Sequence, residues 1–107
     1  MKTYTMNYWG NQWNIFLSQE KYDNNGRLAV LAFTTDDGEY FGDITVNLDD
    51  PLPIGDYAFV DTNNSPWAVE LLEKNGIAQP TGGYARSGFC LYPVYKFDLS
   101  KLEKSQF

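Results

Sequence analysis

The stretch Leu28-Ala29-Val30-Leu31-Ala32-Phe33 decides the fold, because it is apolar at every position and has no polar face to turn toward water. A short apolar run of this kind is typical of a strand that is covered on both faces. Residues that favour tight turns bound the run on both sides, as Asn24-Asn25-Gly26 before it and Asp36-Asp37-Gly38 after it. We therefore predict a central strand with an antiparallel neighbour on each side.

The two neighbouring segments alternate between apolar and polar positions. Residues 12–21 and 39–48 both show the period of two that suits a half-buried strand. In 39–48 the even-numbered hydrophobic residues are predicted to face the core, and the odd-numbered residues, including Glu39 and Asp43, to face solvent. A further strand is predicted over residues 2–8, followed by a turn at Trp9-Gly10-Asn11.

The C-terminal half is predicted to supply the helix and the last strands. Prolines and glycine make 49–56 a loop, and 57–60 is short and apolar. Ser65 is predicted to cap a helix that begins at Pro66 and ends at Asn75-Gly76, with Ile77 packing back on the helix in a Schellman motif.

Residues 79–88 are rich in glycine and are predicted to form a loop, and 89–97 to form a last strand. Pro93 should place that strand at a sheet edge or a bulge, and the tail from Asp98 is predicted to fray. The prediction is an α+β fold in one domain, residues 1–107. An antiparallel sheet of about five or six strands carries the helix on one face, through Trp67, Leu71 and Leu72.

The charge distribution is uneven. Residues 28–73 hold ten carboxylates and no Lys or Arg, within a chain of net charge −6. A negative protein is a poor ligand for nucleic acid or anionic lipid and attracts basic partners instead. One interpretation is a solvated face that keeps the protein soluble. The other is a surface that partly mimics nucleic acid and binds a basic protein through its exposed acids: Asp36, Asp37, Glu39, Asp43, Asp49 and Asp50.

Several classes of chemistry are disfavoured. The chain has no histidine, and its one cysteine, Cys90, lies in an apolar segment and is predicted to be a small buried hydrophobe. Residues 61–72 resemble a calcium loop only at their start, since Pro66 and Leu72 replace the glycine and glutamate such a loop needs. We predict no enzyme activity, metal or cofactor. With no apolar run of signal-peptide or membrane-spanning length, we predict a cytoplasmic location.

Aromatic residues make up 17% of the chain, more than a small core readily absorbs. Most should lie in the core, but Trp9 and Tyr84 are candidate anchors for a binding surface. They support an alternative prediction, a module that binds carbohydrate or peptide.

Three motifs in order carry a family resemblance. Thr45-Val46-Asn47-Leu48, then residues 61–67 (DTNNSPW), then residues 87–95 (SGFCLYPVY) resemble short acidic proteins of unknown function carried on conjugative and integrative elements of Gram-positive and gut bacteria. The resemblance runs from about Gly10 to Phe97 and supplies no catalytic residues. It implies a mobile-element setting, in which accessory proteins include inhibitors of CRISPR and restriction systems.

The resemblance and the charge together predict a small non-enzymatic inhibitor. Its partner would be a basic nucleic-acid-binding defence protein, such as a Cas effector or a restriction enzyme, and it would bind neither nucleic acid nor membrane directly. An accessory role in a conjugation complex is a third possibility, and the oligomeric state stays open.

Overall fold

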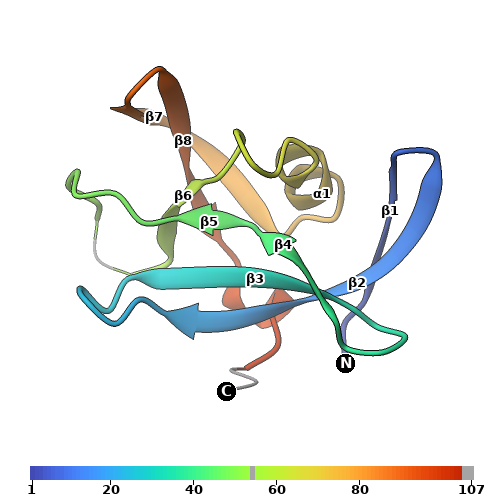
Figure 1. Ribbon diagram of the computed structural model, residues 1–107. Coiled ribbons are helices and arrows are strands. Elements are labelled where there is room, and N and C mark those ends of the chain that lie inside the picture. Colours follow the sequence, from blue (N-terminus) through green and yellow to red (C-terminus); the bar gives the residue numbers. More distant parts are fainter. Residues whose placement is uncertain (54, 105–107) are drawn as a thin grey trace.

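Two four-stranded antiparallel sheets, rather than the single sheet predicted, form the framework of the protein (Figure 1). A computed structural model describes residues 1–53 and 55–104, so position 54 of the predicted 49–56 loop and residues 105–107 of the tail lie outside the described residues. The domain measures 36 × 28 × 22 Å. The α+β class is confirmed and the strand count is corrected to eight within the described residues.

The N-terminal sheet has the order β1-β2-β3-β4, and the C-terminal sheet the order β5-β6-β8-β7. The strands of the N-terminal sheet are β1 (Tyr4–Tyr8), β2 (Asn11–Lys21), β3 (Leu28–Thr34) and β4 (Tyr40–Asp43). Those of the C-terminal sheet are β5 (Thr45–Val46), β6 (Tyr57–Val60), β7 (Ala78–Ser87) and β8 (Cys90–Phe97). One helix, α1 (Ala68–Lys74), and a 3-10 turn, η1 (Leu99–Lys101), complete the described elements.

The predicted central strand is confirmed. β3 lies between β2 and β4, and both flanking turns contain a glycine at positive φ, 69° at Gly26 and 69° at Gly38. Val30 and Ala32 are fully buried between the sheets. On the opposite face Phe33 stacks on Phe16 with ring centroids 5.5 Å apart, which explains why this strand has no polar face.

The single strand predicted over 39–48 is wrong, because the chain changes sheet at Ile44. The Ile44 N–H donates to the Val30 carbonyl of β3 at 2.9 Å, and the Ile44 carbonyl accepts the N–H of Asp61, just after β6, at 2.9 Å. One fully buried residue therefore joins the two sheets. β4 belongs to the first sheet and β5 to the second.

A β-bulge at Phe41 also reverses the predicted faces of the first part of this segment. Ala32 pairs with Gly42, but its neighbour Phe33 pairs with Tyr40, which leaves Phe41 as an extra residue. An extra residue shifts every preceding side chain to the other face. Tyr40, predicted to face the core, is therefore 59% exposed, and Phe41, predicted to face solvent, packs against the core.

Thr45 was predicted to face solvent and is instead 3% exposed. Its hydroxyl accepts the Val30 N–H at 3.0 Å and shares a hydrogen bond of 2.8 Å with the Tyr22 hydroxyl. A buried N–H without a partner is costly, so the threonine replaces a ladder hydrogen bond where β4 has ended.

Residues predicted to form a glycine-rich loop form β7, an edge strand of the C-terminal sheet. Its register shifts between Pro80 and Tyr84, where Gly82 adopts a φ of 88° and supplies slack for a bulge. Pro80 is tolerated because an edge strand leaves half of its N–H groups unpaired. Pro93 was predicted to mark an edge or bulge. It lies in the internal strand β8, where it pairs with Tyr84 next to the bulge of β7 and has no β6 partner, since Val94 is the last β8 residue that pairs with β6.

The helix begins at Ala68 rather than Pro66, and Ser65 does not cap it. The Ser65 hydroxyl donates to the Asp43 carbonyl at 2.5 Å and so ties the turn before α1 to the end of β4. The predicted Schellman ending is confirmed: the Ile77 N–H donates to the Leu72 carbonyl at 2.8 Å, and Gly76 has a φ of 64°. Glu70 lies on the exposed side of the helix, as predicted.

The core lies between the two sheets and under the helix. Residues from both sheets and α1 form one buried cluster that includes Ile15, Ile44 and Leu72. A second, smaller cluster around Phe59 covers the other face of the C-terminal sheet, beneath the segment after β5. Cys90, predicted to be buried, is a half-buried member of it.

The tail was predicted to fray, and it is anchored instead. Glu103 accepts the Gln19 N–H and donates its own N–H to the Leu17 carbonyl, both at 2.7 Å, so the tail adds a short parallel bridge beside β2. Leu102 is 7% exposed within the main core.

We predict that Leu102→Ala lowers the free energy of unfolding by about 2–3 kcal/mol, because the substitution removes a buried side chain and leaves a cavity. The same substitution at Leu91, which is 50% exposed, should cost less than about 1 kcal/mol. Urea unfolding followed by circular dichroism measures both values. Equal costs at the two positions would show that the tail does not contribute to the core.

Stability should fall in alkali because of Tyr95, which is 3% exposed and donates to Glu73 Oε2 at 2.5 Å. Burial, and then the hydrogen bond to Glu73, raises the pKa of the Tyr95 phenol well above its usual 10. The unfolded chain therefore loses this proton at a lower pH than the folded protein does. The stabilisation is complete below pH 10 and is lost as the pH rises above it.

The measurement is urea unfolding of the native protein and Tyr95→Phe at neutral pH and above pH 10. The phenylalanine variant should show a shallower decline in the free energy of unfolding with pH. Identical pH dependence of the two proteins would contradict this assignment.

Candidate binding site

Of the six acids predicted to bind a partner, five fall into groups at the two ends of β3, and Asp43 pairs with Leu31 in the middle of that strand. Asp36, Asp37 and Glu39 lie in and beside the β3–β4 turn, whereas Asp49 and Asp50 follow β5 on the opposite side of the molecule (Figure 1).

Two observations separate the groups. The Arg27 side chain, before β3, donates to the carbonyl of Leu48 at 2.7 Å, which holds the second group at the start of that strand. The seven residues of β3 span roughly 23 Å, and the first group follows the far end. The acids therefore do not form one continuous surface.

Within the β3–β4 hairpin, two of the acids hold the local structure. Asp37 accepts from the Thr34 hydroxyl at 2.5 Å and from the Glu39 N–H at 3.1 Å, and these bonds, the hydroxyl first, lower the pKa of Asp37. Asp43 accepts from the Tyr40 hydroxyl at 2.7 Å. Burial and that hydrogen bond raise the pKa of Tyr40 to about 12. Asp36 and Glu39 are exposed and form no such side-chain bond within the described part of the chain.

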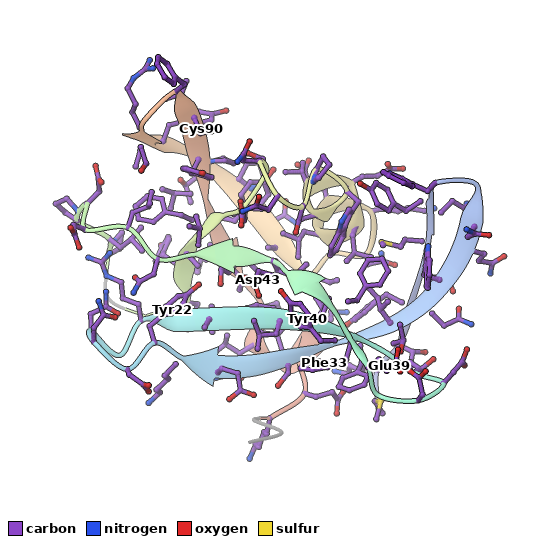
Figure 2. All side chains as sticks on the ribbon, in the orientation of Figure 1. Tyr22, Phe33, Glu39, Tyr40, Asp43 and Cys90 are labelled. Carbon is purple, nitrogen blue, oxygen red and sulfur yellow. The ribbon has the colours of Figure 1, made fainter. Side chains whose placement is uncertain are left out.

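Figure 2 shows Glu39 near the β3–β4 turn and Cys90 at the other end of the molecule. The structure also has an aromatic groove of about 390 Å³. The groove draws its walls from β1, the β1–β2 turn, β2, β4 and the segment before α1. Its lining residues are Tyr8, Trp9, Asn11, Trp13, Phe41, Asn64 and Trp67.

Trp9 forms the exposed lip of this groove in a strained conformation. It is 84% exposed and has a φ of 56°, the only non-glycine residue in the described ranges with a positive φ. It precedes Gly10, with a φ of 74°, in a two-residue turn that normally takes Asn or Gly at both positions. A bulky residue in this region costs about 1–2 kcal/mol. Such strain gathers at functional sites.

The floor of the groove is a chain of ring contacts. Phe41 lies between Trp13 and Trp67, with centroid distances of 5.0 and 5.1 Å, and Tyr8 approaches Trp67 at 6.4 Å. The Trp13 indole N–H donates to the Tyr8 carbonyl at 3.2 Å, which fixes the orientation of that ring. The floor is therefore ordered by packing, while the Trp9 ring at the edge contacts the Tyr8 ring, with centroids 5.9 Å apart.

The position of Trp67 depends on a nearby glycine that leaves room for its ring, and on hydrogen bonds within the preceding turn. A Cβ at Gly42 would lie 3.0 Å from the Trp67 ring, so only glycine lets the indole rest on β4 without displacement. Asp61 is 3% exposed and accepts from both the backbone and side-chain nitrogens of Asn64 at 3.1 Å. These bonds leave the Asn64 amide oxygen available as an acceptor at the groove.

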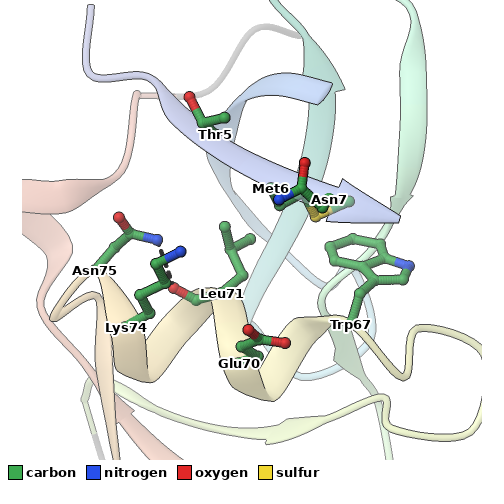
Figure 3. Close-up of a pocket in the computed structure, with 8 residues that line it drawn as sticks. All are labelled: Thr5, Met6, Asn7, Trp67, Glu70, Leu71, Lys74 and Asn75. Atoms are coloured by element: carbon green, nitrogen blue, oxygen red, sulfur yellow. Dashed lines mark hydrogen bonds between the residues drawn. The ribbon is translucent and has the colours of Figure 1, made fainter. Parts of the chain in front are cut away.

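Two exposed carboxylates are close in the chain to residues that line the groove, and neither belongs to its lining. Glu39 precedes Phe41 by two residues, roughly 7 Å along a strand, and Glu70 follows Trp67 by one helical turn. Figure 3 shows Glu70 and Trp67 beside a narrow cleft of about 60 Å³ between α1 and β1, which is too small for more than a few waters. Lys74, one turn further along α1, also lines this cleft.

Tyr84, the second predicted anchor, lies far from Trp9. The β1–β2 and β7–β8 hairpins extend from opposite ends of the molecule (Figure 1). Tyr84 is 66% exposed on β7 beside Leu91, and the nearby Phe89 at the tip of that hairpin is fully exposed. The predicted aromatic anchors therefore belong to two separate surfaces.

Sequence comparison places the chain in a family. The profile of a domain of unknown function, DUF4313, matches residues 16–106. The chain belongs to the DUF4313 family. No curated protein and no solved structure gives a significant match. Phe41, Trp67 and the acids lie within the matched DUF4313 region, whereas β1, Trp9 and Trp13 precede it.

Two further features of the described DUF4313 chain bear on its chemistry. No three Cys, Asp or Glu side chains in residues 1–53 and 55–104 are grouped so as to hold a metal ion. Over the same residues, no helix has the length and apolar character needed to cross a bilayer.

Sequence reasoning identified Trp9 but missed the rest of the groove. Trp67 was predicted to pack the helix on the sheet, and it does lie against the core, whereas Phe41 was assigned to the wrong face. The available signal was the Trp9-Gly10 pair, since a tryptophan before glycine in a two-residue turn must adopt a positive φ.

Replacing Trp9 by asparagine should raise the free energy of unfolding by about 1 kcal/mol, because asparagine tolerates a positive φ. The melting temperature should rise by about 5 °C. Trp9→Ala is the matched control: it removes the same ring but retains the strained Cβ, so it should not be stabilised. Thermal unfolding by calorimetry distinguishes them, and equal stability of the two variants would show that the turn is not strained.

Proposed function

We propose that this DUF4313 protein is a non-enzymatic inhibitor that binds a basic nucleic-acid-handling protein. The partner would be a Cas effector or restriction enzyme of the host that carries the mobile element. The observation that supports this proposal is the pair of exposed acids, Asp36 and Glu39, on a projecting hairpin within a stretch of 46 residues that lacks Lys and Arg.

The proposed contact is smaller than a continuous nucleic-acid mimic. Asp49 and Asp50 lie at the other end of β3 and would serve chiefly to steer a basic partner at long range. The hairpin acids would form the direct contacts. Complementary charge at the edge of an interface raises the association rate, and salt screens this attraction. Binding should therefore weaken as the ionic strength rises.

A second candidate function is binding of carbohydrate or of an uncharged peptide. The exposed indole of Trp9 above an ordered aromatic floor favours it, since aromatic rings stack on apolar faces of ligands. This alternative predicts binding that depends on Trp9 and varies little with salt.

Reversing the charge of the free hairpin acids, Asp36→Lys with Glu39→Lys, should reduce capture of the partner about tenfold by slowing association. Asp37 and Asp43 are left unchanged because their hydrogen bonds hold the hairpin. The matched control, Asp49→Lys with Asp50→Lys, carries the same change in charge at the other end of β3 and should reduce capture much less, because those acids steer the partner without contacting it.

The measurement is affinity capture from a lysate of a bacterial host at low and high salt, with and without nuclease, followed by a cleavage assay of the captured enzyme. A salt-sensitive, nuclease-resistant basic nuclease that the protein inhibits would support the proposal. Equal capture by the two charge-reversed variants, or capture independent of salt, would contradict it.

A further inference from the structure

We infer that the aromatic groove is a receptor for an arginine side chain of the partner, with Trp9 as a lid over the guanidinium. The inference deepens the proposed function and rests on it for the identity of the partner as a basic protein. It assigns the ligand chemistry to a site that is distinct from the charged turn itself.

The first argument is the composition of the walls. Five aromatic residues line the groove, and three of them are tryptophans: Trp9 at its outer end, and Trp13 and Trp67 at its floor. A cation within about 6 Å of an indole face is attracted by the ring, and the attraction is strongest for tryptophan. The groove therefore offers aromatic faces both at an exposed edge and at an ordered base.

The second argument is charge complementarity. Glu39 and Glu70 do not line the groove, but both are exposed and stand two and three residues from Phe41 and Trp67, which do line it. An apolar ligand would gain nothing from carboxylates near the groove, whereas a cation gains from both the rings and the acids. The only basic residue that lines the adjoining cleft, in the ranges described, is Lys74, one turn beyond Glu70.

The aromatic rings and hydrogen-bond acceptors of the site favour a planar cation with several N–H donors. A guanidinium is planar, stacks on aromatic rings and can direct parallel N–H bonds to a carboxylate, which a compact ammonium cannot do. The Asn64 amide oxygen, whose nitrogen is committed to Asp61, offers a further acceptor at the groove. Arginine therefore fits the site better than lysine.

The conformation of Trp9 supports the same conclusion. A strained turn that leaves 84% of an indole in water lowers stability without contributing to the core. The contact of this ring with Tyr8, at a centroid distance of 5.9 Å, restrains it before a ligand arrives, which reduces the ordering cost of binding. The β7–β8 tip also carries an exposed aromatic residue, Phe89, but Phe89 does not adopt a positive φ.

The test uses a short synthetic peptide with two arginines and the same peptide with citrulline, a neutral isostere, at both positions. Titration into the full chain is followed by the NMR signals of the indole N–H groups of Trp9, Trp13 and Trp67. The arginine peptide should shift the Trp9 and Trp67 signals and bind about tenfold more tightly than the citrulline peptide. Lysine at both positions should give intermediate affinity.

Variants assign the binding to the groove. Trp9→Asn, which suits the turn, and Glu39→Gln, which is exposed, should each weaken the arginine peptide several-fold. Phe89→Ala, at the opposite hairpin, should leave it unchanged. Equal affinity for arginine and citrulline peptides, an unchanged affinity in Trp9→Asn, or preferential binding of oligosaccharides to the groove would overturn the inference.

The peptide titration and the capture experiment can contradict the groove inference and the proposed function independently. Capture of a basic nuclease that is lost on Asp36→Lys with Glu39→Lys but kept in Trp9→Asn would overturn the groove inference and support the proposed function. Arginine-dependent shifts at Trp9, together with capture that ignores the charge reversal, would support the groove and overturn the proposed function.

Discussion

The two sheets are held together by the hydrogen bonds that replace a strand ladder where the chain changes sheet. Ile44 donates to β3 through its N–H and accepts from the end of β6 through its carbonyl. The buried Thr45 hydroxyl then accepts the Val30 N–H, which has lost its strand partner. An apolar residue at position 45 would leave that donor buried and unpaired, so the crossing depends on this one hydroxyl group.

The groove is a consequence of this crossing. Because β4 ends after four residues, its carbonyl at Asp43 is free to accept the Ser65 hydroxyl, and the segment before α1 is held against the strand. Trp67 then rests on Gly42 and Phe41, whose ring faces inward only because of the bulge. The crossing that divides one predicted strand into two therefore also brings together Trp13, Phe41 and Trp67, which come from distant parts of the chain.

Local patterns predicted the elements whose determinants lie within a few residues. The apolar run of β3, the glycine turns at Gly26 and Gly38, and the Schellman ending at Gly76 all follow from short-range rules. The predictions failed where a neighbouring strand determines the structure. The glycine-rich segment that was predicted to be a loop forms β7 because β8 pairs with it. Alternation cannot locate a bulge, because one inserted residue leaves the sequence pattern intact on either side.

The same distinction applies to the candidate site. Exposure of the acids near the β3–β4 turn and of Trp9 could be predicted from turn chemistry. Their relation to Phe41, Asn64 and Trp67 could not, since these residues come from separate elements that only the tertiary structure brings together. The split of the acids into two groups has the same origin: they are close in sequence, but β3 and the crossing at Ile44 direct them to opposite ends.

The residues that lower stability lie apart from the interactions that hold the fold together. A tryptophan at positive φ and neighbouring carboxylates that repel one another both lower stability. Both occur at hairpin turns, whereas the crossing at Thr45 and the buried cluster around Ile44 lie in the interior. Substitutions at Trp9, Asp36 or Glu39 therefore leave the hydrogen bonds that join the sheets untouched. The hairpins can take on a different ligand chemistry without any change in the interactions that hold the fold together.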